Sequence, residues 1–122
     1  MDIQTPFKLE FISFKTEDFK DKKKSLLKHL KSYPEKKYPG FTSNRGNQGL
    51  ADIVGQIFEK EFLSLSDYFK TNINLYDAWT ATYKKDEYHI PHNHGSKGFC
   101  GILYLDMHKK SPVTCYMQPW HS

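Results

Sequence analysis

The chain of 122 residues is 38% hydrophobic and 16% aromatic, which is enough for a single core and excludes wholesale disorder. Its 18 lysines and arginines outnumber its 14 acids, but only Arg45 is an arginine, so the composition disfavours a surface that reads nucleic acid through guanidinium groups. No apolar run approaches the roughly 20 residues of a membrane span and the N-terminus has no signal-peptide pattern, so we expect a cytoplasmic protein with no membrane partner.

The first third of the chain predicts a short strand followed by a helix. Residues 7–14 alternate imperfectly between apolar and polar, as in a strand. Thr16 has the character of a helix N-cap, and apolar residues then recur at helical spacing until Pro34 ends the helix. Four lysines fall mostly on the solvated side of this helix: Lys20, Lys22, Lys23 and Lys24. We interpret them as a solvated face rather than as a surface for nucleic acid or lipid.

The middle of the chain predicts a loop and then a core helix. Residues 34–49 are rich in Pro, Gly, Asn and Ser, which is typical of a loop. Residues 50–69 follow with a broad apolar stripe at helical spacing. We expect this helix to supply much of the core.

The last part of the chain predicts strands. Residues 75–83, 99–107 and 113–117 are aromatic or continuously apolar, as strands of a sheet should be. Two cysteines, Cys100 and Cys115, are too few for a disulfide framework, and we expect buried thiols. Helices first and strands later predict the α+β class.

A histidine-rich segment lies between the first two of these strands. Side chains two residues apart in an extended segment point to the same side, so the imidazoles of His92 and His94 can converge on one cation. His89 stands three residues before His92 and is expected to face elsewhere, unless Pro91 kinks the chain. An exposed polar loop that binds nothing is the competing interpretation. Two neutral imidazoles suit Zn, Fe, Ni or Cu better than Mg or Ca.

The run AWTATYKKDEYHIPHNHGSKGFCGILYLD resembles the metal-site region of the 2-oxoglutarate- and Fe(II)-dependent oxygenases, in their small bacterial and phage-type branch. The resemblance spans roughly residues 44–107. The matching positions are a strand tryptophan, the His-x-His pair and three residues of the next strand: Trp79, His92, His94, Gly101, Tyr104 and Leu105. Cys100 and Leu103 depart from the serine and tyrosine that are usual in that strand.

The resemblance implies a double-stranded β-helix, or jelly roll, preceded by helices. It implies Fe(II) held by His92 as first ligand and by His94 at the second position, where most of the superfamily has an Asp. It also implies 2-oxoglutarate as cosubstrate, with Tyr104 as a candidate hydrogen-bond donor to the cosubstrate carboxylate. Iron and cosubstrate would carry the oxidation, while the protein orients them.

Members of that family have a distal histidine and a basic residue for 2-oxoglutarate several strands after the His-x-His. Only His108 and His121 follow His94, and no arginine follows Arg45. We therefore expect residues 1–122 to form a single domain that is the N-terminal part of a longer jelly-roll domain, cut short or a reduced relative. An incomplete site of this kind would leave the chain inactive alone.

Three other functions compete with the oxygenase hypothesis. A cupin-like metal protein would have a Glu three or four residues after its His-x-His, where Lys97 and Gly98 stand here. A non-catalytic jelly-roll binding domain would leave the histidines without a metal. The composition disfavours a nucleic-acid module, because the lysines and the aromatic strands lie in different parts of the chain. The sequence names no substrate, and an open sheet edge predicts a homo-oligomer.

Overall fold

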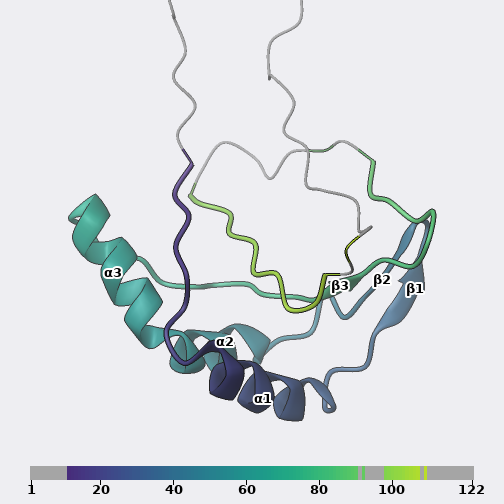
Figure 1. Ribbon diagram of the computed structural model, residues 1–122, viewed down its shortest axis with the longest axis horizontal. Helices are drawn as coiled ribbons and strands as arrows, with labels where there is room; N and C mark the ends of the chain where they lie inside the picture. The colour runs from purple at the N-terminus through teal and green to yellow at the C-terminus, as the bar shows by residue number, and fades with distance from the viewer. Residues whose placement is uncertain (1–10, 91, 93–97, 108, 110–122) are drawn as a thin grey trace, which may run out of the picture.

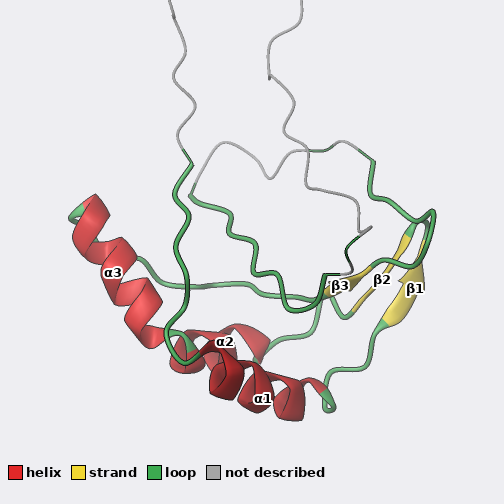
Figure 2. Cartoon of the chain, in the orientation of Figure 1, coloured by secondary structure: helices red, strands yellow, loops and turns green. Residues whose placement is uncertain are grey.

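The computed structural model describes residues 11–90, 92, 98–107 and 109. Over these residues the chain forms helices on one side and a small antiparallel sheet on the other (Figure 1, Figure 2). The elements are α1 (Phe19–Leu30), β1 (Lys36–Tyr38), β2 (Phe41–Ser43), α2 (Leu50–Ile57), α3 (Glu59–Phe69) and β3 (Ala81–Thr82). The α+β class is therefore confirmed, while a jelly roll is not visible in the described part and stays a prediction.

Helix α1 begins later than the sequence predicts. Asp18, not Thr16, occupies the N-cap, with a left-handed backbone at φ 52° and no hydrogen bond from its side chain to the helix. Its carbonyl oxygen accepts hydrogen bonds from the amides of Asp21 and Lys22, at 3.1 and 3.0 Å. The prediction of a Thr16 cap was wrong because Asp18, two residues further on, is also a capping residue type, and the helical turn begins after it.

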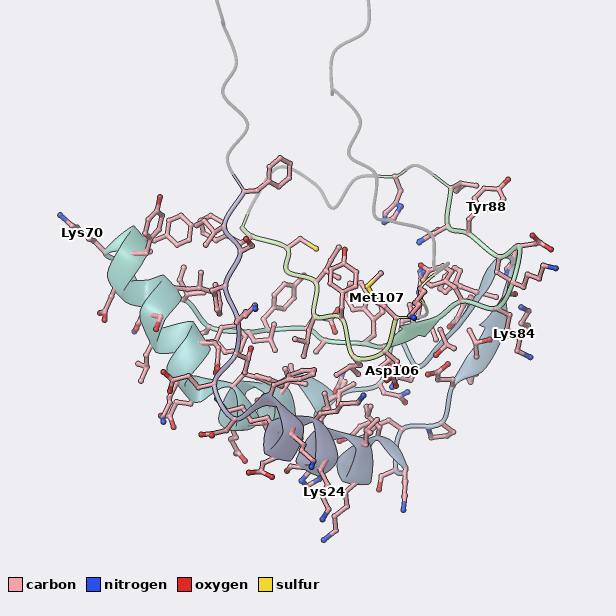
Figure 3. The ribbon with its side chains drawn as sticks, viewed as in Figure 1. Lys24, Lys70, Lys84, Tyr88, Asp106 and Met107 are labelled. Carbon is pink, nitrogen blue, oxygen red and sulfur yellow. The ribbon has the colours of Figure 1, made fainter. Side chains whose placement is uncertain are left out.

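The lysines of α1 divide into two groups. Lys20 and Lys24 are exposed as predicted, and Lys24 points away from the body of the molecule (Figure 3). Lys22 is mostly buried and pairs with Glu61 of α3 at 2.8 Å. Lys23 pairs with Asp106 at 2.6 Å. Two of the four lysines therefore tie α1 to distant segments rather than facing solvent.

A β-hairpin occupies part of the predicted loop. Strands β1 and β2 pair antiparallel with Tyr38 opposite Phe41, so Pro39 and Gly40 alone form the turn. Gly40 has φ +84°, and a Pro-Gly pair suits the type II turn, which needs a positive φ at its third position. The loop prediction was wrong here because proline and glycine, read as loop residues, also build tight hairpin turns.

The predicted helix over 50–69 is two helices. The break falls at Phe58, whose backbone has φ −106° and ψ 30°. Its side chain is 5% exposed and packs in the core with Leu26 and Leu50. The apolar periodicity continues through the break, so the sequence gives no sign of it, and tertiary packing of Phe58 accompanies the change in helix direction.

The third strand of the sheet is much shorter than predicted. Of residues 75–83 only Ala81 and Thr82 pair with β2, which gives the strand order β1-β2-β3. Residues 99–107 and the described residues 11–14 form no strand, so both strand predictions are wrong over that part of the chain. The predicted strand at 113–117 lies outside the described residues.

Buried polar side chains fix β3 against β2. The Ser43 hydroxyl donates to the Thr80 carbonyl at 2.6 Å, and the Asn44 side-chain oxygen accepts from the Thr80 amide at 2.8 Å. Asn44 also donates to the Tyr33 carbonyl at 3.3 Å. Because Ser43 and Asn44 are 0% and 2% exposed, these bonds are shielded from water and hold residue 80 beside the hairpin.

The core lies where the three helices meet. Leu26, Leu50 and Phe58 are its buried members. Partly buried side chains surround them: Leu30, Tyr33, Val54, Ile57, Phe62, Ala78 and Leu105. Cys100 is exposed, so the buried-thiol prediction was wrong for it, and Cys115 lies outside the described residues. In the described residues no helix is long and apolar enough to cross a membrane.

Candidate functional site

The segment after β3 folds back over the hairpin and carries the histidines with it. Lys37 of β1 forms an ion pair with Glu87, whose other carboxylate oxygen accepts a hydrogen bond from the Lys84 amide at 2.8 Å. At the hairpin turn the backbones are in close contact. A Cβ placed on Gly40 would lie 2.2 Å from the carbonyl oxygen of Tyr88, so only glycine allows this approach.

Stacked rings lead from the sheet to the histidines. Phe41, 5% exposed, contacts the ring of His89 with centroids 4.6 Å apart. His89 in turn stacks on His92 with centroids 4.1 Å apart and planes at 28°. On the strand side, Tyr38 stacks on Phe41 at 5.3 Å, and the Arg45 guanidinium lies over Tyr38 at 5.2 Å. We call the rings of Tyr38, Phe41, His89 and His92 the ring stack.

The expectation that His89 faces away from His92 is therefore wrong. Strict two-residue alternation holds for a strand in a ladder, and the described residues between 83 and 92 form none. The sequence does hold a signal, since Pro91 between the two histidines was the one condition under which they could meet.

A hydrogen bond defines the tautomer of His92. Its Nδ1 lies 2.9 Å from the carbonyl oxygen of Ile90. Because a carbonyl oxygen can only accept, Nδ1 must carry the proton, which places the lone pair of the neutral ring on Nε2. Metal-binding histidines commonly donate their other ring N–H to a carbonyl in this way.

Tyr83 lies beside Phe41 of the ring stack. Its ring contacts Phe41 with centroids 5.9 Å apart. Burial raises the pKa of the Tyr83 phenol, because the charged form loses solvation there. The ordinary pKa of tyrosine is already about 10, so the side chain is neutral at physiological pH.

Of the other predicted site residues, the structure describes two, and both are partly exposed. His94 lies outside the described residues. Tyr104 is 49% exposed on the extended segment 98–107, and Trp79 is 42% exposed just before β3. Among the residues that the structure describes, no group of three or more His, Cys, Asp or Glu side chains is placed to hold a metal ion.

Two open hollows lie away from the histidines. One, of about 570 Å³, lies between α2, α3 and residues 72–75. The other, of about 590 Å³, lies between α3 and residues 12–17. Neither lining contains a histidine or a cysteine, so the donors that suit a transition metal are found at the ring stack instead.

Comparisons with protein-family models, with curated proteins and with solved structures find no match for this chain. The resemblance to the oxygenases therefore depends on the residues of the His-x-His region themselves.

Proposed function

We propose that the chain carries the iron-binding region of a 2-oxoglutarate- and Fe(II)-dependent oxygenase, with His92 and His94 as metal ligands. The observation that carries the proposal is the hydrogen bond between His92 Nδ1 and the Ile90 carbonyl oxygen. It selects the tautomer in which Nε2 can coordinate a metal, and it restrains the ring before any metal arrives.

The chemistry of the His92 side chain suits iron as one ligand of a non-haem site. Imidazole nitrogen is a suitable ligand for Fe(II), and His92 is exposed, so a cation and exogenous ligands can reach it. When bound, iron with 2-oxoglutarate supplies the oxidising chemistry. The stacking of His92 on His89 and Phe41 orients the His92 ring against the hairpin, and the Tyr104 hydroxyl would be the hydrogen-bond donor to the cosubstrate carboxylate.

Replacing His92 with alanine is the direct test of the metal site. We expect the affinity of the chain for Fe(II), measured by anaerobic titration, to fall by more than the roughly 10–100-fold that loss of an outer-shell partner costs. His29 lies on α1, is exposed and is not part of the ring stack, so His29→Ala is the matched control and should bind as the parent does. Unchanged binding by His92→Ala would refute the proposed site.

We further propose a cytoplasmic protein that assembles with a second copy through a sheet edge. In the described sheet β1 and β3 are the outer strands, and an outer strand can pair with another chain. Light scattering at micromolar concentration should give the mass of a dimer or a larger assembly. A monomer mass across the accessible concentrations would exclude this mode of assembly.

A further inference from the structure

We propose that His89 is a positioning residue for His92, acting through its flat ring and not as a metal ligand. The inference rests on the proposed metal site and assigns a role to a histidine outside the His-x-His pair. It is carried by the stacking of His89 between Phe41 and His92.

Phe41, the member of the ring stack that lies in β2, is held in place by its surroundings. Phe41 lies in β2, hydrogen-bonded to β1 on one side and followed by the buried Ser43 and Asn44. Phe41 is itself 5% exposed, so its ring has little freedom. His89 transmits this rigidity, because its ring contacts Phe41 at 4.6 Å and His92 at 4.1 Å between centroids. A side chain three residues from the ligand thus connects it to the sheet.

The geometry favours positioning over direct coordination by His89. The two imidazoles meet face to face at 28°, and the lone pair of an imidazole nitrogen lies in the ring plane. A face contact by His89 therefore does not cover the in-plane lone pair of His92. The stack restrains the tilt of the His92 ring, and the bond from Nδ1 to the Ile90 carbonyl restrains its rotation. Together they preorganise one ligand, as supporting groups of metal sites do.

Two substitutions distinguish the effect of the flat ring of His89 from the effect of its nitrogens. His89→Phe keeps a flat ring and removes both nitrogens, whereas His89→Ala removes the ring. We expect His89→Ala to weaken Fe(II) binding about tenfold and His89→Phe to bind within about threefold of the parent. If His89→Ala fails to fold, His89→Leu replaces it, because leucine keeps bulk without a flat face.

The same variants have a readout that needs no metal. Nitrogen-15 NMR of the metal-free chain reports the fraction of His92 with the proton on Nδ1, which should fall in His89→Ala and stay near the parent value in His89→Phe. Binding by His89→Ala equal to the parent, or His89→Phe as weak as His89→Ala, would overturn the positioning role. A parent chain that binds no Fe(II) would defeat the proposed function, and the NMR comparison would then decide the positioning role alone.

Discussion

Alanine at position 40 is expected to destabilise the fold by about 2–4 kcal/mol, from backbone strain and from steric overlap together. Gly40 has φ +84°, which L side chains rarely adopt. The added Cβ would also lie 2.2 Å from the Tyr88 carbonyl oxygen, which is backbone and cannot swing aside. The histidine segment must therefore move off the hairpin, which should also weaken Fe(II) binding. Urea unfolding should show the loss of stability, and Fe(II) titration the loss of affinity.

Gly46 provides the matched control for that substitution. Its φ is +87°, nearly that of Gly40, but no heavy atom lies within 4 Å of where its Cβ would be. Gly46→Ala therefore carries the backbone strain without the overlap, and we expect a smaller loss of stability with Fe(II) affinity unchanged. Equal effects of the two substitutions on both measurements would show that the contact between the turn and residue 88 does not hold the histidines.

Truncation of Leu50 to alanine should destabilise the chain by about 2–5 kcal/mol, the range for a large buried aliphatic side chain. Leu50 is 1% exposed and lies between Leu26 and Phe58 in a core with few fully buried members. A small core cannot easily collapse around the lost volume. Such a loss is a large fraction of the usual 5–15 kcal/mol of folding stability, and a shifted urea midpoint with an unchanged slope should reveal it.

Leu63 offers the same chemical change at the surface. It lies on α3 and is 58% exposed. Leu63→Ala should therefore shift the urea midpoint by about 0.5 kcal/mol or less, as is usual for surface positions. If the two alanine variants unfolded at the same urea concentration, the core would not be centred on Leu50.

The helices were predictable from sequence because their signal is local. The apolar stripe over 50–69 and the stop at Pro34 depend on neighbouring residues, and α1, α2 and α3 fall within the predicted spans. The strands were not predictable in the same way, because a strand forms only where another segment of the chain pairs with it. Residues 99–107 have strand-like composition, yet no such partner pairs with them in the described structure.

The candidate site was predictable only in part. Spacing singled out His92, and the structure adds the carbonyl of Ile90 as its hydrogen-bond partner. The role of His89 was missed because two-residue alternation of side chains applies only within strands. Its contact with Phe41 depends on where the hairpin of residues 36–43 lies in the fold. The turn at Pro39 and Gly40 had a recognisable two-residue pattern that indicates a hairpin, but its position beneath His89 depends on the tertiary fold.

The ring stack has a thermodynamic consequence for any ligand of His92. Because His92 stacks on His89, and His89 on Phe41 of the hairpin, a cation that prefers this ordered arrangement must stabilise the hairpin by the same free energy. Metal binding at His92 is thus linked to the pairing of strands β1 and β2. The protection of their amides against hydrogen exchange becomes a measure of metal binding some fifty residues further along the sequence.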